Sequence, residues 1–167
     1  MSYRICKECN SYMHYHPPYD MSYPYLKCPS CGFTKESKPM LKEVTIEEYL
    51  MGRDKNNPLT DEMKKDAQET VKRANLLLKA FKSYRSVTSG YRPASINAAV
   101  GGAKKSNHMI CRACDLEDKD GELDKFCSSN INILKEIGLW LESPNNTIGW
   151  CHVQIVPPKS GNIIFIP

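Results

Sequence analysis

The sequence has no long apolar run and no apolar leader. Its 167 residues contain no stretch approaching the roughly 20 apolar residues of a membrane helix. The N-terminal segment MSYRICKECN lacks the apolar core of a secretory signal peptide. We therefore expect no membrane partner and no signal peptide, and a protein that stays in the cytoplasm until another factor releases it.

The sequence also has little excess charge. Lysine and arginine number 23 against 19 acidic residues, and the formal net charge is +4. The basic residues are spread along the chain, so the one-sided positive charge typical of nucleic-acid-binding proteins is missing. A nucleic-acid partner is therefore not expected, and the mild charge is compatible with both an anionic surface and plain solubility.

Cysteine, by contrast, is plentiful, and half of it falls in the N-terminal segment. Cys6, Cys9, Cys28 and Cys31 form two C-x-x-C pairs, the spacing of a four-thiolate structural zinc site. Gly32 permits the positive φ that a turn of this kind often needs. So short a segment cannot fold on apolar burial alone, and bound metal would supply the missing stability. We predict a separate zinc ribbon over residues 1–38.

The loop between the two pairs is rich in aromatic side chains. It carries Tyr12, Tyr15, Tyr19, Tyr23 and Tyr25, together with His14 and His16. Packing around the zinc module is the favoured role for the tyrosines, and a face that binds sugar or peptide is the alternative. Few basic residues are interleaved with the rings, which disfavours a nucleic-acid-binding ribbon. With four cysteines available, the histidines are interpreted as loop residues.

Residues 39–167 have the pattern of a larger α+β domain, in which helices flank a central antiparallel sheet. Thr45 and Glu48 form a capping box for a short helix, and Thr60 caps a long one over 61–81 with apolar residues every three or four positions. Further helices are predicted in 95–106 and over 121–142. A strand leading into a turn is predicted over 86–93, and further strands are predicted at 112–116, 147–156 and 162–166.

Three residues of this domain form a candidate metal set. His108 and Asp115 lie in the segment SNHMICRACD, and His152 lies in WCH far downstream. Two nitrogens and one oxygen, with a fourth position left to water, make the open ligand set of a catalytic zinc. His108 and Asp115 would be about 10 Å apart along a helix and about 23 Å apart along a strand, whereas ligands of one zinc lie within roughly 4 Å of each other. The chain must therefore bend between them. Taken singly, each would be interpreted as an ordinary loop, turn or strand residue.

This segment resembles the signature S-x-H-x-x-G-x-A-x-D of the D-Ala-D-Ala metallopeptidase family. That family includes L-alanyl-D-glutamate endopeptidases of phage lysis systems and shares its fold with the hedgehog signalling domain. Ser106, His108, Ala113 and Asp115 match the signature, and Cys111 stands where the family has glycine.

Three further motifs extend the resemblance over roughly residues 40–167. SGYRP at 89–93, then Asn97 and the glycine pair 101–102, are similar to the phage and bacterial branch of the family, and WCHVQ is similar to its closing strand.

The resemblance implies a zinc-dependent hydrolase that cuts the stem peptides of bacterial peptidoglycan, as a carboxypeptidase or an endopeptidase. His108, Asp115 and His152 would hold the catalytic zinc, which lowers the pKa of its water and polarises the scissile carbonyl. Arg92 would bind the substrate's carbonyl or carboxylate and steady the oxyanion, and Ser106 would help to hold substrate. Together with the ribbon, this makes one catalytic and one structural zinc. An enzyme of this kind would act as a phage endolysin that reaches the cell wall through a holin-made hole, or would ride in a virion.

One element of the family pattern is missing. The family places a carboxylate or histidine as general base two or three residues before the last zinc ligand, and those positions are Trp150 and Gly149 here. Glu142 is the only acid in the predicted loop 142–150 and is therefore the candidate base. The alternative function is a non-catalytic, zinc-bearing module that binds the cell wall or a partner. A zinc-ribbon nucleic-acid protein would leave the second half of the chain unexplained.

The remaining cysteines have two interpretations. Cys111, Cys114, Cys127 and Cys151 could form a second structural zinc site, but Cys127 and Cys151 are single residues on a predicted helix and strand. Free cysteines are commonly buried as small apolar residues, so core packing is favoured.

Overall fold

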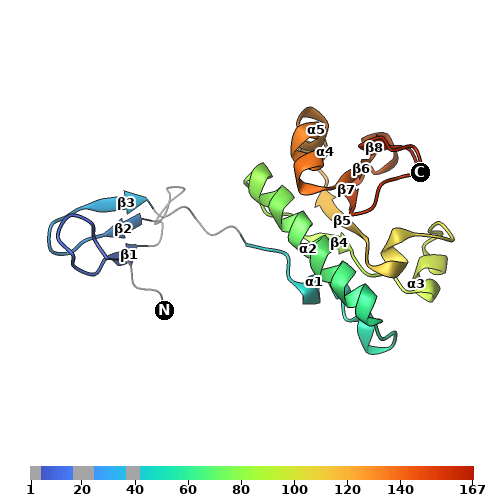
Figure 1. The fold of residues 1–167 in the computed structure, drawn as a ribbon, viewed down its shortest axis with the longest axis horizontal. Helices are drawn as coiled ribbons and strands as arrows, with labels where there is room; N and C mark the ends of the chain where they lie inside the picture. The colour runs from blue at the N-terminus through green and yellow to red at the C-terminus, as the bar shows by residue number, and fades with distance from the viewer. Residues whose placement is uncertain (1–4, 17–24, 37–41) are drawn as a thin grey trace. The chain divides into compact units, whose positions relative to one another are not determined.

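The computed structural model describes residues 5–16, 25–36 and 42–167. The chain divides into two compact units, Met1–Met40 and Leu41–Pro167 (Figure 1). Among the described residues, no helix combines the length and the apolar character needed to span a bilayer.

The N-terminal unit contains a small antiparallel sheet and two matching turns. The strands are β1 (His14–His16), β2 (Tyr25–Lys27) and β3 (Thr34–Glu36), in that order. In each C-x-x-C turn, the amide four residues after the first cysteine donates to that cysteine's carbonyl, from Asn10 to Cys6 at 2.9 Å and from Gly32 to Cys28 at 3.0 Å. The positive φ predicted for Gly32 is confirmed at 75°, and Asn10 has the same conformation at 59°. Asparagine is one of the few residues other than glycine that adopt it readily.

The predicted roles of the ribbon's tyrosines and histidines are only partly covered by the structure. Tyr19, Tyr23 and the side chains of Tyr15, Tyr25 and His16 lie outside the described residues. Tyr12 is 62% exposed, and His14 is exposed as well.

The larger unit is a mixed α/β structure built on a five-stranded sheet in the order β4-β5-β7-β6-β8. Neighbouring strands are antiparallel except β6 and β8, which are parallel, so one edge departs from the predicted all-antiparallel sheet. The strands are β4 (Val87–Ser89), β5 (Ala113–Asp118), β6 (Trp140–Glu142), β7 (Gly149–Gln154) and β8 (Ile164–Phe165).

In the first half of this unit, the helices begin at the predicted N-cap residues. The Thr45 capping box is present, and the Thr60 hydroxyl accepts a hydrogen bond from the Met63 amide. The α-helices are α1 (Ile46–Leu50), α2 (Asp61–Phe81), α3 (Ala94–Ala99), α4 (Glu122–Ser129) and α5 (Ile131–Ile137). Short 3-10 helices are η1 (Arg53–Lys55), η2 (Asn107–Ile110) and η3 (Pro144–Asn146).

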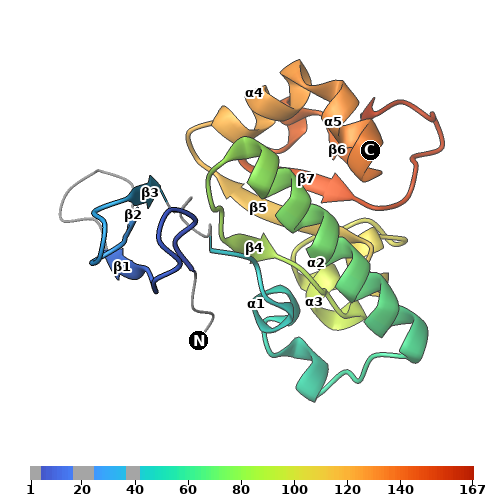
Figure 2. The same ribbon diagram turned by 60° about the vertical axis from the view of Figure 1, so that its left-hand side comes forward.

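One face of the sheet forms the core. Helices α2, α4 and α5 pack against it, and α2 crosses over β5 (Figure 2). The side chains that point to this face are completely buried: Cys114, Leu116, Leu141, Cys151 and Val153. Cys111 and Cys127 are equally buried in the same cluster. Burial raises the pKa of Cys111 to about 12, so its thiol stays protonated. The complete burial of these four cysteines in the core cluster agrees with the predicted packing role.

The single helix predicted over residues 121–142 is wrong. The structure divides this segment into α4 and α5 at Asn130, and its last three residues form strand β6. Gly138 ends α5 in the left-handed conformation, with its amide donating to the Leu134 carbonyl. Beyond it, Leu139 and Leu141 are buried while Trp140 and Glu142 are only partly so, which is the two-residue alternation of a strand.

The start of α4 depends on buried acids. Both carboxylate oxygens of Asp118 accept backbone hydrogen bonds, from Leu123 and Asp124, at 2.9 Å. Asp124 is 7% exposed, and its Oδ1 has no partner among the described residues. Burial, reinforced by the Asp118 charge, raises the pKa of Asp124 to about 6.

Replacement of Asp124 by asparagine should therefore stabilise the protein at alkaline pH. The folded state holds the Asp124 proton more tightly than the unfolded chain, so stability falls as pH rises between about 4 and 6. Asp124→Asn should raise the free energy of unfolding by about 1–2 kcal/mol at pH 8 and change it little near pH 4. Denaturant unfolding at both pH values measures this, with exposed Glu122→Gln as the control. Equal effects at the two pH values would contradict it.

Candidate metal centre

The three predicted ligands come together on the face of the sheet opposite the helices. His108 lies in η2, and Cys111, with φ of 61°, turns the chain from η2 into β5. The predicted bend between His108 and Asp115 is thereby confirmed. Asp115 on β5 is paired directly with His152 on β7. Residues separated widely in sequence thus present their side chains to one point.

The distances between the ligand atoms suit a small metal ion. His108 Nε2 lies 3.3 Å from His152 Nδ1 and 3.2 Å from Asp115 Oδ1. A tetrahedral zinc with bonds near 2.0–2.2 Å keeps its ligand atoms about 3.3–3.5 Å apart. The third pair, His152 Nδ1 and Asp115 Oδ1, is closer at 2.7 Å because the two atoms share a hydrogen bond. The donor set and its spacing therefore fit zinc.

The ring of His108 is held in a fixed orientation. Its Nδ1 lies 2.8 Å from the carbonyl oxygen of Gly90 and donates to it, which leaves the Nε2 lone pair directed at the other two ligands. Gly90 must be glycine here, because a Cβ would collide with the Tyr49 carbonyl. The glycine of the S-G-Y-R-P segment thus sets the tautomer of a ligand.

Asp115 is kept anionic. Burial by itself would raise the pKa of its carboxyl, but the adjacent His108 and His152 rings outweigh burial and hold the pKa well below its usual range. A deprotonated carboxylate is the form that binds a metal.

The sequence predicts Glu142 on a loop. In the structure it lies on a strand beside the ligands. It is the last residue of β6, one position beyond the pair of Leu141 and Val153. Glu142 Oε2 is 3.9 Å from His152 Nε2. Phe165, its partner on β8, sets its ring edge-on to His152. Burial raises the pKa of Glu142. Asp115, His152 and Glu142 thus form a row across three strands.

Arg92 and Ser106 meet beside His108. The Arg92 amide donates to the His108 carbonyl at 3.1 Å, and its Nη2 lies 3.4 Å from the Ser106 hydroxyl. That hydroxyl also caps η2 through the His108 amide. Within the described residues, Arg92 has no acidic partner, and its buried Nε has no partner at all. Its charge is therefore available to an anion.

The geometry of the site agrees with a comparison to known protein families. The profile of the family described as Peptidase M15 matches residues 42–139, more than half of the chain. The chain belongs to the peptidase M15 family. The M15 peptidases are zinc-dependent metallopeptidases, and the match includes Arg92, His108 and Asp115 but ends before Glu142 and His152. No curated protein and no solved structure gives a match.

Sequence reasoning missed the contact that joins the two halves of this M15 site. Asn107 Nδ2 donates to Gln154 Oε1 at 2.8 Å, and the Gln154 amide donates to the Val156 carbonyl. Gln154 is 5% exposed. This link ties η2, which carries His108, to β7, which carries His152. The only sequence signal is a polar residue close to each histidine, which is too common to be informative.

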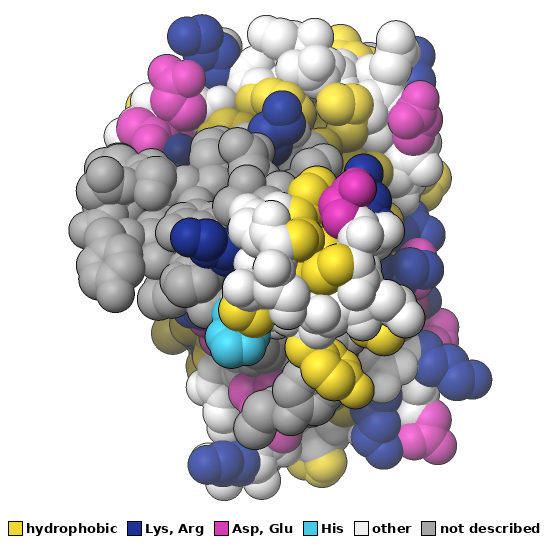
Figure 3. Space-filling view, turned by 90° about the vertical axis from the view of Figure 1, so that its left-hand side faces the viewer, with side chains coloured by type: hydrophobic (Ala, Val, Ile, Leu, Met, Phe, Trp, Pro, Cys, Tyr) yellow, Lys and Arg dark blue, Asp and Glu magenta, His cyan; other side chains and the backbone are white. Residues whose placement is uncertain are grey.

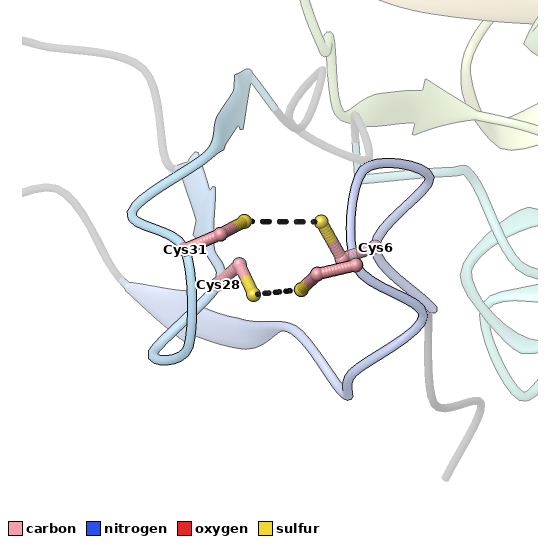
Figure 4. Close-up of side chains that lie close together, drawn as sticks. Cys6, Cys28 and Cys31 are labelled. Carbon is pink, nitrogen blue, oxygen red and sulfur yellow. Dashed lines mark hydrogen bonds between the residues drawn. The ribbon is translucent and has the colours of Figure 1, made fainter.

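The four ribbon cysteines of this M15 peptidase form a second cluster in the other unit. Cys6 Sγ is 3.7 Å from Cys31 Sγ, and Cys9 Sγ is 3.3 Å from Cys28 Sγ (Figure 4). A zinc ion with four thiolates at about 2.3 Å separates the sulfurs by about 3.8 Å. Hydrogen bonds from the Ser11 hydroxyl and amide lower the pKa of Cys9 to about 6, which favours the thiolate.

The purified chain should contain two zinc ions, because two ligand groups of suitable chemistry are present. His108→Ala should leave one, since the buried site loses one of its two histidine ligands. Exposed His14→Ala is the matched control and should leave two. Elemental analysis against protein concentration measures this. One zinc in the wild type, unchanged by His108→Ala, would contradict the assignment.

Proposed function

We propose that the protein hydrolyses peptide bonds in the stem peptides of bacterial peptidoglycan, as a carboxypeptidase or endopeptidase of the phage endolysin-like branch. The observation that carries the catalytic part is the row of Asp115, His152 and Glu142, in which a partly buried acid lies 3.9 Å from His152 Nε2, the ring nitrogen that does not face the other ligands. The substrate class rests on the resemblance of the SGYRP and SNHMICRACD segments to enzymes that cut these peptides.

His108, Asp115 and His152 would hold the zinc, with Asp115 contributing its negative charge. Bound zinc would activate the attacking water and polarise the scissile carbonyl. Glu142 would accept the proton of that water at a carboxylate oxygen and pass it to the leaving amine. Its raised pKa supports this role because a desolvated carboxylate is a stronger proton acceptor. The acid on β6 would replace the one that the family has on β7.

Arg92 would bind the negative charge that develops on the substrate. Within the described residues, no acid neutralises its guanidinium. The Arg92 backbone amide, which donates to the His108 carbonyl, holds the residue near the metal ligands. A fixed positive charge suits an oxyanion or a terminal carboxylate. Ser106, in contact with both Arg92 and the His108 amide, would keep the guanidinium close to the metal ligands and help to hold substrate.

The ribbon would be a structural zinc domain over residues 1–38, joined to a peptidase domain over 39–167. Positive and negative side chains are interspersed on the described surface that Figure 3 shows, and no broad basic patch is visible there. This distribution gives no support to a nucleic-acid role. The cell wall, reached after release from the cytoplasm or from a virion, would be the site of action.

Two variants test the peptidase activity on purified peptidoglycan. His152→Ala should abolish release of amino groups, because the metal loses a ligand. Arg92→Ala should slow release by about 100-fold with zinc still bound, as expected when one oxyanion donor is lost. If the zinc-loaded wild type releases nothing from several wall types but still sediments with them, the protein binds walls without cutting them.

Removal of residues 1–38 should leave the peptidase domain folded. Among the residues that the structure describes, the core cluster of the larger unit begins at Val44 and includes none from the N-terminal unit, so the domain has its own core. The truncated chain should unfold cooperatively within a few degrees of the full chain's upper transition, measured by circular dichroism. Insolubility or a non-cooperative transition would show that the ribbon is part of the same folding unit.

A further inference from the structure

Trp150 lies on the same face of the sheet as the metal ligands. Side chains along β7 alternate between the two faces, so Trp150 and His152 point to one side while Cys151 and Val153 point to the core. Across the sheet, Trp150 is paired with Glu117, and His152 with Asp115. On the ligand face, Trp150 is therefore the side chain next to His152 along β7. The indole lies about 7 Å along the strand from the candidate metal site.

The indole of Trp150 is partly exposed and has no partner in the part of the chain that the structure describes. Trp150 is 39% exposed, whereas its neighbour Cys151 is completely buried. Within residues 5–16, 25–36 and 42–167, its side chain makes no hydrogen bond, ring contact or cation–π contact. Buried indoles usually find a partner for the N–H, and exposed tryptophans are enriched where another molecule binds.

Trp150 and Arg92 lie on opposite sides of the Asp115–His152 pair. Strand β4 is antiparallel to β5, with Ser89 paired to Asp115. The chain after Ser89 therefore runs toward the start of β5, and the Arg92 amide bonds to the His108 carbonyl there. Trp150 is displaced the other way, toward the end of β5 at Glu117. A peptide bound at Arg92 and at the metal ligands would reach Trp150 with its remaining part.

We propose that Trp150 is a substrate-positioning residue, whose indole contacts the stem peptide on the side of the metal ligands away from Arg92. The inference rests on the proposed function. It also gives a role to the position that the family uses for its general base: with the acid moved to β6, the place two residues before His152 is free to bind substrate. A flat, wide ring suits aliphatic parts of a peptide and tolerates several side chains.

Kinetics on soluble stem peptides from purified peptidoglycan test this role. Trp150→Ala should raise KM about tenfold, the loss expected when one well-packed aromatic contact is removed, with kcat within about threefold of wild type. Trp150→Phe should restore most of the affinity. Leu76→Ala, which removes an apolar side chain of similar exposure (42%) on α2, is the control and should change neither constant. An unchanged KM in Trp150→Ala, or a fall in kcat that follows loss of zinc, would overturn the proposal.

Fluorescence supplies a readout that does not depend on turnover. The chain has only two tryptophans, so Trp140→Phe leaves Trp150 as the sole source of tryptophan emission, and Glu142→Gln in the same chain suppresses cleavage. Stem peptides should shift its emission to shorter wavelength and saturate, because the ring becomes covered.

A second probe separates this inference from the proposed function. If the wild type cleaves no stem peptide, the proposed substrate is wrong, and a mixture of random tetrapeptides is titrated into the same variant. A saturable shift with that mixture keeps Trp150 as a peptide-contacting residue. No shift with either probe overturns the proposal.

Discussion

The direct pairing of Asp115 with His152 is the constraint on which the rest of the site depends. The two residues face each other across β5 and β7, with His152 Nδ1 2.7 Å from Asp115 Oδ1. The pairing cannot slip by one residue, because a slip would turn the buried Leu116 and Val153 away from the helices. The apolar core on one face of the sheet thereby fixes the polar site on the other. His108 completes the set from outside the sheet, through its bond to the Gly90 carbonyl.

The same sheet geometry allows the proposed mechanism to use an acid from the strand next to the one that carries His152. Two residues that face each other on neighbouring strands are at least as close as two residues separated by two positions on one strand. Glu142 on β6 lies one position beyond the Leu141–Val153 pair, with its carboxylate 3.9 Å from His152 Nε2, and is partly buried beside Phe165. An acid at this place either accepts a proton during catalysis or orients His152 through the ring nitrogen that does not face the other ligands. In the proposed mechanism, the acid on β6 takes the place of an acid on β7.

Local signals in the sequence were sufficient for part of this structure. Cysteine spacing and ligand order indicated both clusters, and the Thr45 and Thr60 caps gave the starts of α1 and α2. Glu142 could be named as the nearest acid but not placed, because β6 is only three residues long and its position depends on pairing with β7 and β8. The helix predicted through this segment failed for the same reason: tertiary pairing outweighed local helical periodicity beyond Gly138. The Asn107–Gln154 link has no local signature, since it joins residues 47 positions apart.

The most direct test of the account is the activity of Glu142→Gln with its zinc content measured in the same sample. The variant keeps the size of the side chain and removes its ability to accept a proton. With zinc fully retained, single-turnover cleavage of stem peptides should fall by about 10²- to 10⁴-fold, the usual contribution of a general base. Cleavage at the wild-type rate with zinc bound would contradict the account, because the acid on β6 would then have no part in catalysis.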